Sequence, residues 1–328
     1  MDPDYDFQGR LTAEFPSQLV VDTTEVCNLA CIHCPHPGFK QSSYYDARFL
    51  GIELNTKLVD EVRDHGRPYP QYIRYTSEGE PLIHPLAYDM LDYAVENSGV
   101  YVTLTTNGTV MVEKRIQKLL DSGVRMVDIS IDAFKPETYA KIRVNGNLVK
   151  TRANVINLLK WIRESHAKTK VVVSLVEQDL NRSESGDFEA FWKDQGAHYV
   201  VIRRLHSGAG AVIKTADIMR KRVEAIPRRP CVYPWERIVL NPRGFLAFCP
   251  ADWTHGSTVV DYRTTTIRET WQGPFYVALR QAHLTNDYRG HQFCGNCPDW
   301  QVTRWPQEGR AYANLVEELK VLDLVPSP

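Results

Sequence analysis

Residues 25–36, with the sequence EVCNLACIHCPH, place cysteines at positions 27, 31 and 34. Three residues separate the first pair of cysteines and two residues separate the second pair. A structural zinc ion usually has four protein ligands, and disulfides require an even number of cysteines. Three thiols on so short a stretch therefore raise the question of what supplies a fourth ligand.

The composition is that of a globular protein with no general affinity for polyanions. Of the 328 residues 43% are hydrophobic, and 39 Lys and Arg balance 40 Asp and Glu to a net charge of −1. This balance gives no reason to expect nucleic acid or a membrane as a partner. The N-terminal stretch is acidic, and no apolar run approaches the roughly 18 residues of a membrane span, so we expect a cytoplasmic protein. The seven cysteines are then expected to be reduced and to serve a metal or catalysis.

Short β-branched runs alternate with amphipathic stretches up to about residue 205, which is typical of repeated β-α units around a parallel sheet. Right-handed connections would curl six such units into an open, partial barrel with functional loops at the strand C-termini. The expected strands are residues 18–24, 72–77, 100–106, 124–132, 170–176 and 198–204. We expect a barrel at 18–205 after an extension at 1–17, a linker at 206–230, a small domain at 231–300 and a C-terminal helix and tail at 301–328.

The cysteine stretch follows the first of these strands, where such a barrel carries its chemistry. Three thiolates on one loop can hold three irons of a [4Fe-4S] cluster and leave the fourth iron open to a non-protein ligand. The chain here resembles the radical S-adenosylmethionine (SAM) superfamily, in which CxxxCxxC follows the first strand of a partial (β/α)6 barrel. The resemblance implies that Cys27, Cys31 and Cys34 hold this cluster and that SAM binds the open iron. Three unrelated core cysteines, or a zinc site with a distant ligand, are the alternatives.

Other loops extend the resemblance. TSEGEPLIHP after the second strand is similar to the superfamily's GGEP segment, although Glu78 replaces its first glycine. TTNGT and SIDAFKPETYAKIR follow the third and fourth strands. The resemblance implies SAM contacts from residues near the strand C-termini, namely Gly79, Glu80, Asn107, Ser130, Arg143 and Val176. The alternatives are a strand hydroxyl bonded to backbone for Ser130, a solvated helix-end charge for Arg143 and a core position for Val176.

The remaining cysteines form a second set: Cys231, Cys249, Cys294 and Cys297. The first two flank a predicted β-hairpin with its turn at NPRG, and the last two form a CxxC. Four thiolates can fully ligate one metal centre, either a structural zinc ion or an iron–sulfur cluster. The segment resembles the shortened SPASM domain called twitch, a β-hairpin plus helix that holds one auxiliary [4Fe-4S] cluster. This resemblance implies that SAM and two [4Fe-4S] clusters are the cofactors.

The two cysteine sets account for all seven cysteines, so no thiol is free to donate hydrogen to a substrate radical. This favours oxidation, with the fully ligated cluster as electron acceptor, over radical epimerisation. Oxidation also requires a base, and the candidates are Arg203, Arg204 and His206 at the end of the sixth strand and Asp252 beside Cys249. The alternative for the first three is that they face solvent or helices.

Three hypotheses about the substrate stand together. The twitch resemblance implies oxidation of a secondary alcohol in a small polyol or aminocyclitol, whereas many SPASM relatives modify peptides. Only 26 residues precede Cys27, which leaves no room for a peptide-recognition domain and favours a small molecule. The third hypothesis is a zinc-binding interaction module without enzyme activity. The basic residues 219–230 could dock an acidic electron donor such as flavodoxin or ferredoxin, hold a substrate phosphate, or simply be solvated.

Overall fold

The computed structural model describes residues 5–66, 69, 72–76, 78–223, 226–309 and 312–324. Across these residues the strands form one sheet in the order β6-β5-β4-β3-β2-β1-β7-β8-β9. The strands are β1 (Gln18–Val21), β2 (Tyr72–Tyr75), β3 (Tyr101–Thr106), β4 (Met126–Ser130), β5 (Lys170–Glu177), β6 (Tyr199–Arg204), β7 (Arg237–Leu240), β8 (Phe245–Ala247) and β9 (Thr258–Asp261). All six predicted barrel strands are confirmed, and β1 to β6 are parallel neighbours in chain order.

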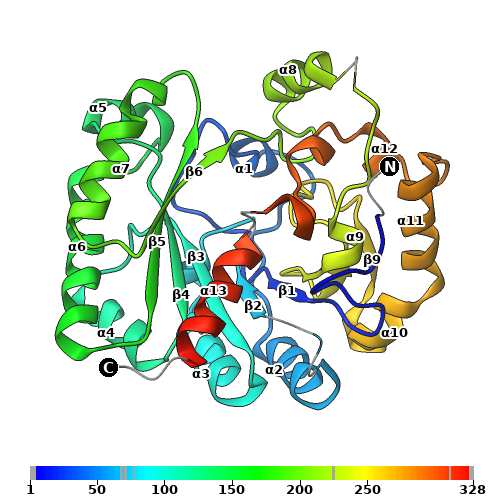
Figure 1. Ribbon diagram of the computed structural model, residues 1–328, viewed down its shortest axis with the longest axis horizontal. Coiled ribbons are helices and arrows are strands. Elements are labelled where there is room, and N and C mark those ends of the chain that lie inside the picture. The colour runs from blue at the N-terminus through cyan, green and yellow to red at the C-terminus, as the bar shows by residue number, and fades with distance from the viewer. Residues whose placement is uncertain are drawn as a thin grey trace.

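The helices alternate with the strands and lie mainly outside the curved sheet (Figure 1). They are α1 (His36–Phe39), α2 (Ile52–Glu61), α3 (Ala87–Ser98), α4 (Glu113–Asp121), α5 (Pro136–Ile142), α6 (Leu148–Ser165), α7 (Ser185–Asp194), α8 (Ile213–Val223), α9 (Tyr233–Glu236), α10 (Ile267–Gln272), α11 (Pro274–Thr285), α12 (Gln292–Asn296) and α13 (Tyr312–Leu324). Within the described ranges no helix has the length and apolar character needed to span a bilayer.

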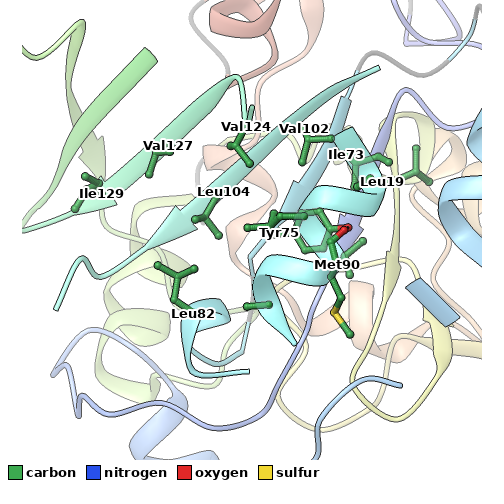
Figure 2. Packing of buried hydrophobic residues seen from close by; sticks show 14 of the residues in the cluster. Leu19, Ile73, Tyr75, Leu82, Met90, Val102, Leu104, Val124, Val127 and Ile129 are labelled. Carbon is green, nitrogen blue, oxygen red and sulfur yellow. The ribbon is translucent and has the colours of Figure 1, made fainter. Parts of the chain in front are cut away.

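The two faces of the barrel sheet differ in polarity because side chains alternate along each strand. Apolar residues such as Leu19, Ile73 and Leu104 point toward the outer helices and form the main core (Figure 2). The alternate positions carry polar residues such as Arg74 and Asp128, which line an interior cavity. The alternation therefore builds a barrel with an apolar shell and a polar interior.

The second half of the chain extends the same sheet. Strand β7 pairs in parallel with β1, and β8 returns antiparallel to β7 through the predicted turn at residues 241–244. The Asn241 side chain accepts hydrogen bonds from the backbone N–H groups of Arg243 and Phe245, and Gly244 adopts a φ of 84° that favours glycine. The predicted hairpin is confirmed, and it is joined to the barrel by backbone pairing.

Sequence analysis did not predict helix α8 and did not predict where the C-terminal helix α13 packs. The predicted linker at 206–230 contains α8, so this connection is not unstructured. Helix α13 lies in front of the sheet and packs Ala313, Val316 and Leu319 against the lower inner face of the barrel (Figure 1). This packing makes α13 the floor of the cavity. Residues 1–4, 224–225, 310–311 and 325–328, which belong to the predicted extension, linker and C-terminal segment, lie outside the described residues, as does residue 77 of the predicted second strand.

Candidate active site

The three clustered cysteines lie on a loop that leaves the C-terminal end of β1. Cys31 is buried, and Cys27 and Cys34 are half-buried. The loop is fixed to the C-terminal end of α5, because the backbone N–H groups of Ala30 and Ile32 donate to the carbonyls of Val144 and Ile142 at 3.0 Å. All three thiols line a cavity of about 620 Å³ inside the barrel. The loop therefore presents all three thiols to one cavity.

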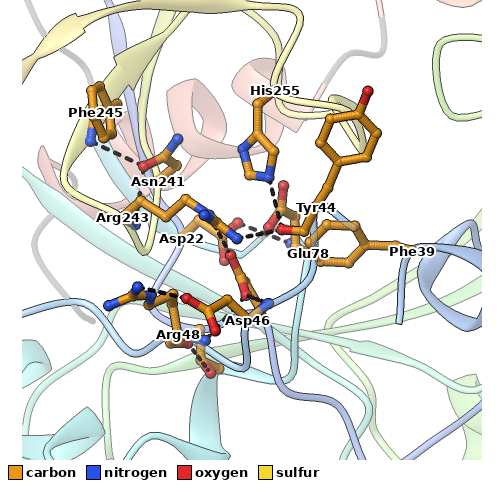
Figure 3. Close-up of polar contacts among 12 residues, drawn as sticks. Asp22, Phe39, Tyr44, Asp46, Arg48, Glu78, Asn241, Arg243, Phe245 and His255 are labelled. Atoms are coloured by element: carbon orange, nitrogen blue, oxygen red, sulfur yellow. Dashed lines mark hydrogen bonds and ion pairs between the residues drawn. The ribbon is translucent and has the colours of Figure 1, made fainter. Parts of the chain in front are cut away.

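Glu25 connects the start of this loop to two other segments of the protein. Its buried carboxylate accepts hydrogen bonds from the backbone N–H groups of Asp46 (2.8 Å) and Arg48 (3.1 Å). It also accepts one from Nε of Arg243, at 2.8 Å, in the hairpin turn (Figure 3). Sequence analysis did not identify Glu25, because its partners lie far away in the chain.

Gly79 and Glu80 hold the loop after β2 against the cysteine loop. The Glu80 N–H donates to the Val26 carbonyl at 2.9 Å. The Glu80 carboxylate accepts from the Thr106 hydroxyl (2.6 Å) and from the backbone N–H groups of Asn107 (2.7 Å) and Leu82 (3.2 Å). Through these bonds the Glu80 side chain joins the loops after β2 and β3, and both Gly79 and Glu80 line the cavity.

Arg143 is buried and forms an ion pair with Asp132. The alternative interpretation of Arg143 as a solvated charge at a helix end is therefore wrong. Its Nη2 lies 2.6 Å from Oδ2 of Asp132, and its Nε donates to the same oxygen at 2.8 Å. Burial is the largest influence on Asp132 and alone would raise its pKa, but the Arg143 guanidinium, His33 and the hydrogen bond from the Val176 N–H together outweigh burial and lower the pKa. Burial lowers the pKa of His33, 3.4 Å from Asp132, to about 4, so this imidazole is neutral at neutral pH. Asp132 also accepts from the Val176 N–H at 2.7 Å.

The inner wall below this level carries an arginine pair that shares one carboxylate. Nη2 of Arg203 lies 2.5 Å from Oδ2 of Asp128, and Nη2 of Arg74 lies 3.5 Å from the same atom. Arg74 also donates to the Thr105 hydroxyl and stacks on the Tyr312 ring of α13 at 3.7 Å. Arg74, Arg203 and Asp128 line the cavity above α13. This group of three side chains contains two guanidinium groups and one carboxylate.

The structure separates the predicted bases. Arg203, Arg204 and His206 line the cavity, as do the six predicted SAM contacts. Asp252 does not reach it, because its carboxylate accepts from the backbone N–H groups of Thr254, Gly256 and Ser257 and so shapes its own loop. Of the predicted candidates, Asp252 is therefore the one that the structure does not bring to the site.

The second cysteine set lines the same cavity. Cys231 precedes α9, Cys249 follows β8, and Cys294 and Cys297 lie in and just after α12. Among all described residues, no three His, Cys, Asp or Glu side chains approach closely enough to hold one metal ion.

The surroundings of both sets fit iron–sulfur clusters. Burial raises the pKa of the Cys27 thiol to about 11 and those of Cys34 and Cys297 to about 12, so these thiols ionise only when a metal stabilises the thiolate. Two of the residues that line the cavity, His283 and Arg228, each have a buried nitrogen atom, Nε2 and Nε respectively, without a hydrogen-bond partner among the described residues. Buried donors of this kind are rare unless a bound group satisfies them.

Comparisons with known proteins agree with this geometry. The Radical SAM superfamily matches residues 21–179, and an iron–sulfur cluster-binding domain of the SPASM type matches residues 231–298. The AdoMet-dependent heme synthase of Methanosarcina barkeri is 33% identical over 146 residues, which are 44% of this chain and 40% of that protein. A probable GTP 3′,8-cyclase of Methanocaldococcus jannaschii is 27% identical over 189 residues, 56% of this chain and 57% of that protein. The chain thus spans about half the length of these curated relatives or less.

The chain therefore carries a radical SAM domain at residues 21–179 and a SPASM-type iron–sulfur domain at residues 231–298, and the cofactors of these domains are SAM and two [4Fe-4S] clusters. Among solved structures, BtrN in complex with AdoMet and 2-DOIA shares the fold with a TM-score of 0.60 at 17% identity, covering 86% of this chain and 92% of that one. Streptococcus suis SuiB bound to the precursor peptide SuiA has a TM-score of 0.64 at 13% identity, covering 93% and 73%. At these identities the likeness concerns the fold alone.

Proposed function

We propose that this protein oxidises a secondary alcohol of a small molecule to a ketone. The observation that carries the proposal is that both cysteine sets line one cavity and together use every cysteine of the chain. When bound, SAM and its cluster supply a 5′-deoxyadenosyl radical that removes one hydrogen atom from carbon, and the auxiliary cluster accepts one electron. The hydroxyl proton must then pass to a protein base, and the loss of H•, H⁺ and an electron balances the two-electron oxidation.

The barrel wall supports a role for Asp128 as that base. His206 accepts the Gly208 N–H at Nδ1, which places the proton of a neutral imidazole on Nε2 and makes that nitrogen a donor. Asp128 instead offers carboxylate oxygens on the cavity wall, held by Arg203 and by the Ser174 hydroxyl at 2.8 Å. In the proposal Asp128 takes the proton, while Arg203 and His206 orient the substrate.

The charge of the same wall bears on the substrate. Arg74 and Arg203 carry two positive charges against one carboxylate, and both side chains are mostly buried. An uncompensated buried charge is costly, so a bound anion would stabilise this group. We therefore propose a hydroxylated substrate with a carboxylate or phosphate group, and this charge argues against an ammonium-bearing aminocyclitol.

The test is an anaerobic assay of reconstituted enzyme with SAM, dithionite and a substrate panel. The panel contains hydroxy acids, sugar phosphates, neutral polyols, aminocyclitols and short peptides, each deuterated at the candidate carbon where available. Deuterium transfer into 5′-deoxyadenosine together with a ketone product from an anionic alcohol is the expected result. Product from a peptide, the class of molecule bound in the SuiB structure, would replace the proposal with side-chain modification. An electron donor such as flavodoxin or ferredoxin is proposed as the physiological reductant.

A further inference from the structure

His283 is a buried histidine whose protonated nitrogen is fixed by its neighbours. It lies on α11, and its Nδ1 accepts the backbone N–H of Cys231 at 3.3 Å. The Tyr288 hydroxyl lies 3.1 Å from the same nitrogen and donates to it. A neutral imidazole that accepts at Nδ1 carries its proton on Nε2. The side chain is 3% exposed, and this Nε2–H has no partner among the described residues.

Arg228 places a second unused donor beside the same cysteines. Its Nη1 donates to the Gly295 carbonyl at 2.8 Å and its Nη2 to the Cys294 carbonyl at 2.5 Å. These bonds fix the guanidinium plane, which also stacks on the Tyr288 ring at 4.1 Å. The remaining Nε–H is buried and has no partner in the described part of the chain.

The two unused donors come from different segments and share one environment. His283 contacts the backbone of Cys231, Arg228 contacts the backbone of Cys294, and both line the cavity together with the four cysteines of the second set. A [4Fe-4S] cluster held by four thiolates is an anion whose sulfur atoms accept hydrogen bonds. It is thus a group of the right charge and chemistry to satisfy both donors.

We propose that His283 Nε2–H and Arg228 Nε–H donate hydrogen bonds to sulfur atoms of the auxiliary cluster and raise its reduction potential. Reduction adds negative charge to the cluster, so N–H donors and a nearby guanidinium stabilise the reduced form more than the oxidised form. The inference rests on the proposed function in one respect: a higher potential matters because the cluster is to accept an electron from the substrate radical.

The potential can be measured without any substrate. In a full-length protein with Cys27, Cys31 and Cys34 changed to alanine, the auxiliary cluster is the one left to titrate, and electron paramagnetic resonance follows its reduction. For His283→Phe we expect the equilibrium constant for reduction to fall about tenfold, or about 59 mV for one electron. His283→Gln can still accept from Cys231 and donate to the cluster, so it is expected to recover most of the loss.

Substitutions of Arg228 distinguish the effect of its positive charge on the potential from the effect of its Nε–H hydrogen bond. Arg228→Lys keeps the charge but removes Nε–H, so its potential is expected to lie between that of the unchanged protein and that of Arg228→Met. His166→Phe, at the C-terminus of α6 in the barrel, is the matched histidine control and is expected to leave the potential unchanged. Folded variants with four irons and unaltered potentials would overturn the inference.

A second measurement covers variants that do not fold. Electron nuclear double resonance on the reduced cluster with both side chains intact is expected to show exchangeable protons that disappear in deuterated buffer. If no such protons couple to the cluster, the inference is wrong. Because neither measurement requires turnover, failure to find a ketone product would refute the proposed function and leave this result standing.

Discussion

Gly79 lies where two backbone segments meet, and replacing it with alanine tests how the loops after β1 and β2 are held together. An added Cβ would lie 2.2 Å from the Thr24 carbonyl oxygen and 2.5 Å from the Val26 carbonyl oxygen. Ordinary contacts are about 3.5 Å, so the two loops would have to separate by about 1 Å. The obstructing atoms are backbone, and no side-chain rotation can relieve them. Overpacking of this kind typically costs about 1–3 kcal/mol.

The displaced atoms immediately precede Cys27. A shift of that size misplaces the cluster and SAM relative to each other, and misplacement by about 1 Å can lower a rate about 100-fold. We therefore expect folded Gly79→Ala protein that retains the auxiliary cluster, binds SAM poorly and forms 5′-deoxyadenosine about 100-fold more slowly. Iron analysis, equilibrium dialysis with SAM and timed product analysis give these quantities.

Gly186 in α7 provides the matched control, since a Cβ there meets no atom within 4 Å. Gly186→Ala is expected to leave SAM cleavage unchanged and to stabilise the fold by about 0.5–1 kcal/mol. Normal SAM affinity and normal cleavage in Gly79→Ala would show that the two loops do not depend on this close approach, and the reasoning would be refuted.

Three further predictions concern the cofactor sites. Alanine at Cys27, Cys31 or Cys34 is expected to abolish 5′-deoxyadenosine formation with little change in circular dichroism, because the thiols lie on a loop; normal formation would contradict the cluster assignment. Arg143→Met is expected to weaken SAM binding and also to destabilise the fold by about 3–5 kcal/mol, because it strands a buried carboxylate; denaturant unfolding with no loss would contradict this. Folded Cys249→Ala is expected to keep SAM cleavage but lose ketone product, and a normal ratio of the two would remove the electron-acceptor role.

The sequence predicted the parts of the fold that depend on local patterns. The six strands follow from short β-branched runs, and the hairpin follows from the turn residues NPRG, which are adjacent in the chain. Helix α8 was missed because the glycines before it and the basic residues within it resemble a solvated connection. The local pattern also predicted a C-terminal helix, α13, but it could not show that this helix packs against the barrel and forms the floor of the cavity.

The site was predictable where one loop carries a complete motif and not where distant segments converge. The cysteine loop has its three thiols within one short stretch, so spacing alone identified it. Glu25 and Arg243 are 218 residues apart, and Arg203 and Asp128 are 75 apart, so no sequence pattern connects them. His283 could not be identified for a similar reason, since its significance depends on which of its nitrogens the fold leaves unpaired.

The parallel pairing of β1 with β7 has a mechanical consequence. One hydrogen-bonded ladder, with Val21 opposite Leu240, connects the strand before the first cysteine loop to the strand between Cys231 and Cys249. The separation of the two metal centres is then set by backbone spacing in a sheet, which stretches little, and not by the length of the connection through α8. Because this ladder holds β1 against β7, insertions in that connection are expected to leave the spacing of these two strands unchanged.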